Sequence, residues 1–297
     1  MRRAWSAPGK VLLLGEYGVL AGGRALVAAV NRRALGTTNP AAPPPTPVVE
    51  TAIRLAEGHG CPRLGEGITI DTRAFYDGPV KLGLGSSAAA ALIATALATE
   101  SGDEEALELA IQAHRVATGG GSGVDVAASF YGGVIAAAKQ PGPVSPLPSR
   151  LKGLELSILG TGQAASTSDF IQRVQAWEGF KVTAAQLARY AEDGILAWSK
   201  QDAPRFLSTV ALAGRALDAL GKGAGVPIVT PAVAEAMRIA GIHGAALKPS
   251  GAGGGDVAVL FAADPGVVEE VVRGSGLVRI DAAIDPIGLK EEPADQK

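Results

Sequence analysis

The sequence predicts an α+β protein with a strand-rich N-terminal half, a helix-rich C-terminal half and a cleft between them. Three observations lead to this prediction. Short apolar runs interrupted by glycines, such as Val11–Leu14 and Arg24–Val30, are typical of strands. The alanine-rich run Ala88–Ala98 is typical of a helix. Residues Ser166–Leu220 place apolar side chains three to four positions apart, which predicts three further helices.

The N-terminal half is expected to begin with two strands, Val11–Leu14 and Arg24–Val30, joined by a turn at Gly22-Gly23. Asn39–Pro47 holds five prolines in nine residues, so we expect a surface loop or linker there, with a proline-motif docking site as the alternative. The remaining elements expected in this half are a helix at Val48–Glu57, a strand at Ile68–Asp71, helices at Asp103–Ala117 and Val124–Phe130, and a strand at Val134–Ala138.

A second proline-rich stretch, Pro141–Pro148, is expected to be a loop, and the composition changes after it. We therefore divide the chain into domains at residues 1–150 and 151–297. Beyond the helices at 166–220, the C-terminal half is expected to contain strands at Ala245–Lys248 and Val257–Phe261, a helix at Pro265–Arg273 and a strand at Leu277–Ile284. The charged tail Lys290–Lys297 is expected to be frayed.

Composition excludes several classes of function. Hydrophobic residues make up 47% of the 297 residues, enough for a substantial core, and the formal net charge of −2 offers no broad basic field for nucleic acid. Cys61 is the only cysteine, so no intrachain disulfide or thiolate zinc cluster can form, which fits a reducing cytoplasm. The first apolar run ends at Gly15, and no run reaches about 18 apolar residues. We expect a soluble cytoplasmic protein without a membrane segment.

The stretch Lys81-Leu82-Gly83-Leu84-Gly85-Ser86-Ser87-Ala88 leads directly into the alanine-rich helix. A glycine-rich turn before a helix presents unpaired backbone N–H groups at the positive end of the helix dipole, and this arrangement attracts a phosphate. The alternative is a plain helix start with Ser86 or Ser87 as the N-cap residue. The sequence therefore predicts an anion site here, with helix capping as the competing interpretation.

Two other kinds of nucleotide loop do not fit this stretch. Gly83-x-Gly85-x-x-Ala88 formally matches a dinucleotide fingerprint, but residues 76–81 make a poor parallel strand before it, and Glu104 and Glu105, near the required distance for the acidic residue, fall at a helix start. A Walker A loop would need Gly-Lys-Ser/Thr after the glycines, which the chain lacks. A different kind of phosphate loop is indicated.

Three further features can carry chemistry, each with a structural alternative. Lys10 stands beside a buried strand, where it can bind a phosphate or lie in solvent at a sheet edge. Asp125 follows a glycine-rich turn at a helix start, where it can orient an attacking oxygen or cap the helix. The loop Ser250–Asp256 is rich in backbone and poor in side chains, as in loops that approach a ligand closely.

Together, Ala-Pro-Gly-Lys at 7–10, Gly-Leu-Gly-Ser-Ser-Ala at 83–88 and Ser-Gly-Ala-Gly-Gly-Gly-Asp at 250–256 resemble the three motifs of the GHMP small-molecule kinases. The resemblance extends from Ala7 to about Phe261. It implies an N-terminal domain of the ribosomal S5 type, a ferredoxin-like C-terminal domain, and ATP with Mg²⁺ as the phosphoryl donor.

Within this family the chain looks most like the phosphomevalonate kinases. Ala113-His114, Gly121-Ser122-Gly123-Val124-Asp125, Thr161–Thr167, Tyr76-Asp77-Gly78 and Asp256 match that subgroup, whereas Tyr17 stands where mevalonate kinases usually carry histidine. The resemblance implies ATP-dependent phosphorylation of 5-phosphomevalonate to 5-diphosphomevalonate. The alternatives are mevalonate or another acceptor of the family and, in a different class, a non-catalytic ligand sensor.

The resemblance also implies roles for individual residues. Lys10 and Asp125 would be the catalytic pair. ATP would be held by Lys81, Gly83, Gly85, Ser86, Ser87 and Ala88, with the Ser87 hydroxyl on Mg²⁺. The phosphorylated small-molecule acceptor would be bound by Tyr17, Ser122, Gly123, Ser166, Thr167, Ser250, Gly251, Ala252 and Gly253. His114 is interpreted as a packed core histidine, and a monomer or homodimer is expected.

The chain departs from the family pattern at two places. It is short for a phosphomevalonate kinase, with the proline-rich Asn39–Pro47 where longer structure is usual. Ala117-Thr118-Gly119-Gly120 replaces the Ala-Gln-Gly expected before the aspartate, and no carboxylate ligand for Mg²⁺ is assigned.

Overall fold

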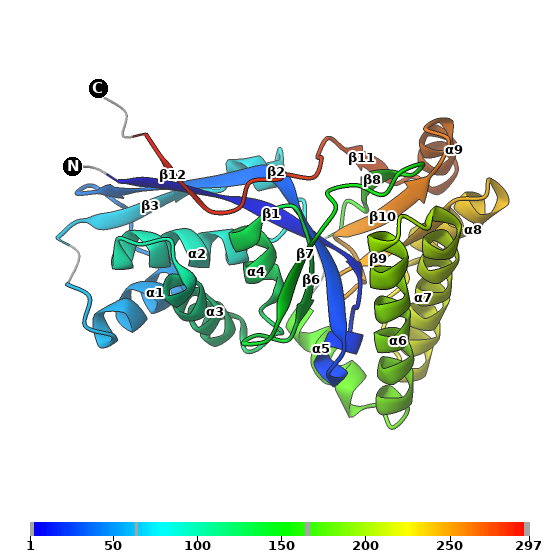
Figure 1. Cartoon of the computed structure of the whole chain (residues 1–297), viewed down its shortest axis with the longest axis horizontal. Coiled ribbons are helices and arrows are strands. Elements are labelled where there is room, and N and C mark those ends of the chain that lie inside the picture. Colours follow the sequence, from blue (N-terminus) through cyan, green and yellow to red (C-terminus); the bar gives the residue numbers. More distant parts are fainter. Residues whose placement is uncertain (1–2, 63–64, 164–166, 294–297) are drawn as a thin grey trace.

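The computed structural model (Figure 1) describes residues 3–62, 65–163 and 167–293. These residues contain two larger antiparallel sheets with helices packed against them, and a small two-stranded sheet formed by Tyr76–Asp77 and Val80–Lys81. The helices are α1 Pro47–Gly58, α2 Ser86–Thr99, α3 Glu104–Thr118, α4 Val124–Tyr131, α5 Thr167–Ala176, α6 Phe180–Ser199, α7 Ala203–Ala224, α8 Pro231–Ile242 and α9 Gly266–Ser275. The strands are β1 Ala4–Leu14, β2 Arg24–Asn39, β3 Gly67–Asp71, β4 Tyr76–Asp77, β5 Val80–Lys81, β6 Val134–Ala138, β7 Val144–Leu147, β8 Glu155–Gly160, β9 Ala246–Ser250, β10 Val257–Ala262, β11 Val278–Ile280 and β12 Lys290–Glu292.

The first sheet has the strand order β12-β1-β2-β6-β7, with β3 also paired to β2. The two predicted strands at its centre are confirmed, and both are longer than predicted. The pairing of β1 with β2 shifts register between Pro8 and Gly9, which is a position where a strand tolerates proline. After this shift Lys10 and Leu12 lie on one face of β1 and Val11 on the other, because successive side chains of a strand alternate.

Helices α1 to α4 form a layer against one face of this sheet, below it in Figure 1. Helix α2 is almost wholly buried because its alanines allow close approach on every side. Glycine in β2 helps, since a Cβ at Gly36 would lie 2.3 Å from Ile93 Cγ2. The stretch Lys81–Ala88, called the phosphate loop below, leads into α2 and is thereby fixed against the centre of the sheet.

The second sheet has the order β11-β8-β10-β9, and helices α8 and α9 share an apolar cluster with it. Helices α6 and α7 form a long antiparallel pair at the right of Figure 1. Trp198, Phe206 and Phe261 meet edge to face between this pair and β10, which anchors the helices to the sheet. The predicted helices at 166–220 correspond to α5, α6 and α7, although residues 164–166 lie outside the described residues.

The prediction of a simple loop at Pro141–Pro148 is wrong. Residues Val144–Leu147 form β7, which pairs with β6 at the edge of the first sheet. An edge strand leaves one row of N–H groups unpaired, so Pro146 removes no ladder hydrogen bond that the sheet requires. Strand β8 and helix α8 were not predicted.

The charged tail is also more ordered than predicted, because Lys290–Glu292 forms β12 and pairs with β1. The segment between β11 and β12 returns from the second sheet to the first, where β12 lies beside β1 in Figure 1. Backbone bonds hold it there: Asp285 N donates to Ala29 O at 3.0 Å, and Leu289 N donates to Phe130 O at 3.0 Å.

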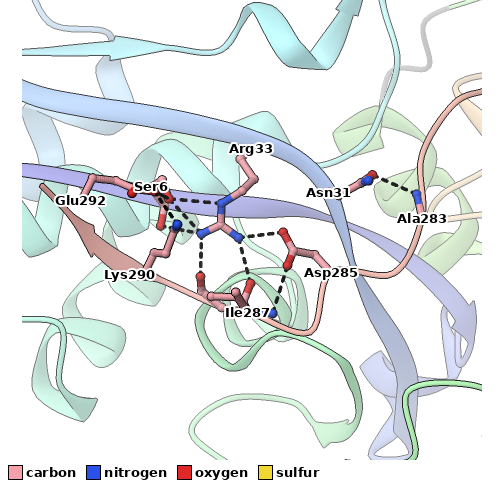
Figure 2. A network of polar contacts seen from close by, with 9 residues as sticks. Ser6, Asn31, Arg33, Ala283, Asp285, Ile287, Lys290 and Glu292 are labelled. Carbon is pink, nitrogen blue, oxygen red and sulfur yellow. Dashed lines mark hydrogen bonds and ion pairs between the residues drawn. The ribbon is translucent and has the colours of Figure 1, made fainter.

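Arg33 is the centre of the polar network that fastens this returning segment (Figure 2). Its guanidinium donates to the carboxylate of Asp285 at 2.7 Å and to the carbonyls of Ile287 and Gly288 at 2.9 and 2.7 Å. It also donates to the Ser6 carbonyl at 3.1 Å, which ties the segment to β1. The planar fork of arginine can satisfy all these acceptors at once, which a lysine cannot do.

Replacing Arg33 with methionine is therefore expected to lower the free energy of unfolding by about 2–3 kcal/mol, because the change leaves Asp285 and several carbonyls without their donor. Urea unfolding at neutral pH measures this loss. The matched control is Arg238→Met, which breaks an exposed pair with Glu235 on α8 and is expected to cost less than about 0.5 kcal/mol. Equal, small effects in the two variants would contradict the role of Arg33.

Candidate active site

The phosphate loop has the geometry of an anion site. Gly83 and Gly85 have φ values of +70° and +85°, which favour glycine. Gly85, in the left-handed region, is the N-cap residue of α2, so the alternative with Ser86 or Ser87 as N-cap is wrong. Within the described part of the chain, the amides of Ser86 and Ser87 donate to no acceptor. These two N–H groups stand at the positive end of a buried helix.

Lys10 lies directly against this loop. Its backbone N–H donates to Leu84 O at 2.8 Å, which joins β1 to the loop. Its side chain passes over Gly85, because a Cβ at Gly85 would lie 2.9 Å from Lys10 Cγ and 3.1 Å from Cε. Any larger residue at position 85 would displace this lysine. The structure thus brings Lys10 to the start of α2, while Lys81 lies exposed on β5 before the loop.

Asp125 lies in the first turn of α4, after the N-cap residue Gly123. Its Oδ1 accepts from the Val126 amide at 3.0 Å, and its Oδ2 lies 3.8 Å from His114 Nε2. The side chain is 24% exposed. His114 is buried, as predicted, and this carboxylate is its charged neighbour.

Lys10 and Asp125 belong to two elements that contact each other, β1 and α4. Val124 of α4 packs with Leu12 of β1 in one apolar cluster, and Lys10 projects from the same face of β1 as Leu12. The two side chains form no ion pair with each other among the described contacts. The phosphate loop, Lys10 and Asp125 therefore lie on the helix-covered face of the first sheet.

The third glycine-rich motif lies against the phosphate loop. A Cβ at Gly83 would lie 2.3 Å from the Cβ of Asp256. Two of its glycines are needed for packing, since a Cβ at Gly253 would meet Ile228 O at 2.4 Å and one at Gly254 would meet the Phe170 ring at 2.1 Å. The space beside Gly251 is open.

The same motif is also bonded to β1 and the turn after it. Leu12 N donates to Ser250 Oγ at 2.9 Å, and the Tyr17 hydroxyl donates to Ala252 O at 2.7 Å. Tyr17 is 4% exposed, so its hydroxyl is used inside the protein. In this structure Tyr17, Ser250 and Ala252, which are predicted to bind the acceptor, hold the third motif against β1 and the turn after it.

A buried ion pair next to these contacts was missed at the sequence level. Lys248 on β9 and Glu16 after β1 pair through their side chains, which are 0% and 1% exposed. Lys248 also donates to Pro249 O at 2.8 Å, and Glu16 Oε2 is buried without a hydrogen-bond partner among the described atoms. Burial lowers the pKa of Lys248, an effect that the negative charge of Glu16 opposes. From the sequence, Lys248 is predicted only to end a strand, and no local signal shows that its side chain is buried.

The remaining predicted acceptor residues are placed only in part. Ser122 and Gly123 lie in the loop before α4, where the Ser122 carbonyl accepts from Gln140 N at 2.8 Å. Thr167 is the first residue of α5, and Ser166 lies outside the described residues.

The hydroxyl of Tyr17 gives a prediction about alkaline stability. Burial, with a smaller contribution from the charge of Glu16, raises its pKa well above the usual value of about 10. Above pH 10 the unfolded chain loses this proton while the folded chain keeps it, so the wild type loses stability as pH rises. Tyr17→Phe is expected to be about 1 kcal/mol less stable at pH 7, with that difference shrinking above pH 10 in guanidinium unfolding. A difference independent of pH would contradict this.

The described residues contain neither a candidate membrane span nor a candidate metal cluster. No helix there has both the length and the apolar character needed to cross a membrane. No group of three or more histidine, cysteine, aspartate or glutamate side chains there is arranged to hold a metal ion.

Comparison with known proteins identifies the family. The family model described as GHMP kinases N terminal domain matches residues 47–133. The chain is 31% identical to a mevalonate kinase from Aeropyrum pernix over 86% of this chain and 88% of that protein. It is also 31% identical to a phosphomevalonate kinase from Streptomyces sp., over 71% of this chain and 65% of that protein.

The fold agrees with these sequence matches. The solved structure of Streptococcus pneumoniae phosphomevalonate kinase in complex with phosphomevalonate and AMPPNP superimposes with a TM-score of 0.80 at 16% identity, covering 95% of this chain and 99% of that one. The predicted α+β fold of the GHMP kinases is confirmed. This chain belongs to the GHMP kinase family.

Proposed function

We propose that this protein transfers the terminal phosphoryl group of ATP to 5-phosphomevalonate, giving 5-diphosphomevalonate and ADP. The observation that carries the proposal is the pair of unpaired amides at Ser86 and Ser87, with the Lys10 side chain lying across Gly85 beside them. A triphosphate needs N–H donors and a nearby cation, and this loop offers both. Membership of the GHMP kinases supports ATP as the donor.

In this proposal the protein works by positioning and electrostatics. The amides of Ser86 and Ser87 hold the phosphates of ATP, and the Lys10 ammonium stabilises the charge on the phosphoryl group as it moves. An oxygen of the acceptor phosphate forms a bond to the terminal phosphorus while the bond to the ADP oxygen breaks. That acceptor oxygen is largely ionised near neutral pH, so Asp125 orients the acceptor more than it removes a proton.

Mg²⁺ would accompany ATP. The described residues contain no cluster that could hold a metal by themselves, but Mg²⁺ usually takes most of its ligands from water and the substrate phosphates. Ser87, half-buried at the start of α2, would supply one hydroxyl to such a shared site. Bound there, the ion would neutralise phosphate charge, and the residues present fit that role.

The choice of acceptor rests on the motifs of the phosphomevalonate kinase subgroup, among them Gly121–Asp125 and Asp256. We infer that Ser122 and Gly123 face the acceptor, and that Ser166 and Thr167 do so as well on the strength of the subgroup motif, Ser166 lying outside the described residues. We also infer that residues 1–150 bind ATP, with the chain end returning to that domain through β12. A second candidate is mevalonate, since the relative matched over 88% of its own length is a mevalonate kinase.

The test is a coupled assay of ADP release with ATP, Mg²⁺ and one of four acceptors: phosphomevalonate, mevalonate, homoserine or galactose. We expect turnover with phosphomevalonate and at most trace rates with the other three. Turnover with mevalonate alone would replace the proposed acceptor with the second candidate. No turnover with any acceptor, together with measurable ligand binding, would replace catalysis with ligand sensing.

A further inference from the structure

The loop between α3 and α4 delivers Asp125 to the site, yet little packing holds it. Gly119, Gly120, Gly121 and Gly123 all have positive φ values, from +75° to +134°. A Cβ at Gly119, Gly120 or Gly121 would meet no atom within 4 Å. Glycine-rich backbone loses much conformational freedom when it is fixed, so something else must hold this loop in one shape.

Two side chains in the last turn of α3 provide that restraint. The Thr118 hydroxyl donates to Gly120 O at 3.0 Å, and Arg115 holds the residues that follow. Its Nε donates to Gly121 O at 3.1 Å, and its Nη2 donates to Ser122 O at 3.0 Å and to Gln140 O at 2.5 Å. The backbone N–H of Gln140 in turn donates to Ser122 O at 2.8 Å. One guanidinium therefore joins the loop to the end of β6, immediately before the chain enters α4.

His114, the residue before Arg115, lies close to the carboxylate of Asp125. His114 Nε2 lies 3.8 Å from Asp125 Oδ2, and His114 is buried. Helix α3, which carries both Arg115 and His114, is stabilised at its start because Asp103 caps its first turn by accepting from Ala106 N at 3.0 Å. One turn of α3 thus holds the loop backbone through Arg115 and faces the Asp125 side chain through His114.

We propose that Arg115 is a positioning residue for phosphoryl transfer, which fixes Asp125 relative to the phosphate loop by holding the carbonyls of Gly121 and Ser122. The inference rests on the proposed function. Arg115 acts through Asp125, because its Nε and Nη2 donate to three carbonyls of the protein and thereby restrain the loop that leads to Asp125. Lysine cannot replace it fully, because a single ammonium lacks the fork that spans these acceptors.

The test is a double-mutant cycle of Arg115→Met and Asp125→Asn, measured by steady-state kinetics with ATP and the acceptor the wild type uses. Arg115→Met alone is expected to lower kcat about 10- to 100-fold, because small misplacements of a positioning group have effects of this size. The KM for ATP is expected to stay within about twofold, since Gly83–Ala88 is unchanged. In the Asp125→Asn background, Arg115→Met is expected to cause less than a further twofold loss, because the group it positions is already gone.

Two further variants complete the test. Arg238→Met, on the exposed face of α8, is the matched control and is expected to keep wild-type kinetics. Arg115→Lys is expected to fall between wild type and Arg115→Met, and it carries the same cycle if Arg115→Met does not fold.

Three outcomes separate the claims. An active wild type with a fully active Arg115→Met would overturn the inference alone. An equal loss in the wild-type and Asp125→Asn backgrounds would also overturn it, because the arginine would then act independently of Asp125. Absence of turnover in the wild type with every acceptor would overturn the proposed function, and this inference with it.

Discussion

Lys10→Met is expected to lower kcat by about 10²- to 10³-fold while leaving the fold intact. The ammonium that stabilises the moving phosphoryl group is lost, and removal of one such electrostatic contact has an effect of this size. The fold should survive because methionine keeps a stem that can lie over Gly85, and the bond from the residue 10 amide to Leu84 O at 2.8 Å involves backbone only. Steady-state kinetics and thermal unfolding of the same preparation measure the two properties.

The matched control for this variant is Lys152→Met, which removes a charge from an exposed lysine in the loop before β8. It is expected to show wild-type kinetics. If Lys10→Met also kept wild-type kcat, Lys10 would be an edge-strand lysine without a part in the reaction. The alternative interpretation of Lys10 would then hold.

Asp125→Asn is expected to lower kcat by about 100-fold, with an effect that depends on the acceptor. Asparagine keeps the shape and can still accept from the Val126 amide, so only the charge changes. With a phosphate acceptor, already ionised, the loss reflects orientation and should change little between pH 7 and 9. With a hydroxyl acceptor, removal of a proton would be required and the loss would be larger.

The control for this variant is Asp281→Asn, at an exposed carboxylate after β11, which is expected to be silent. A fully active Asp125→Asn would show that Asp125 only stabilises the start of α4, which is the helix-capping interpretation given in the sequence analysis. Comparing the two acceptors in one preparation removes any doubt about the amount of folded enzyme.

The elements that the sequence predicts well are those with a strong local signal. The alanine-rich helix, the helix after Asp103 and the central strands all carry their pattern in consecutive residues, and the structure has them. Strand β12 carries no such pattern: Lys290-Glu291-Glu292 has no apolar alternation, and its register against β1 depends on Arg33 and Asp285, which are far apart in sequence. Strand β12 therefore forms because of tertiary contacts, which the local sequence does not reveal.

The candidate site shows the same division. The glycines of the phosphate loop and the position of Asp125 after a glycine-rich turn follow from local sequence, and both are found at helix starts. The partners of these residues do not follow from it. Asp256 packs against Gly83, and the Tyr17 hydroxyl donates to Ala252 O. Each contact joins parts of the chain that are distant in sequence and meet only in the folded protein.

Glu16 and Lys248 illustrate why some buried contacts near the candidate site are not predicted from the sequence. Each residue is an isolated charge next to apolar neighbours, and an isolated charge is usually exposed. Their pairing across 232 positions of sequence makes burial possible, because each charge compensates the other away from water. Without the partner in view, neither residue could be assigned to the interior.

The most direct measurement of the central claim is a ³¹P NMR time course of the purified protein with ATP, Mg²⁺ and 5-phosphomevalonate. We expect the phosphomonoester resonance to be replaced by the two coupled resonances of a diphosphate ester, with one ADP formed for each acceptor consumed. ADP formation with the phosphomonoester resonance unchanged would contradict the claim, as would conversion of mevalonate in a parallel sample that leaves 5-phosphomevalonate untouched.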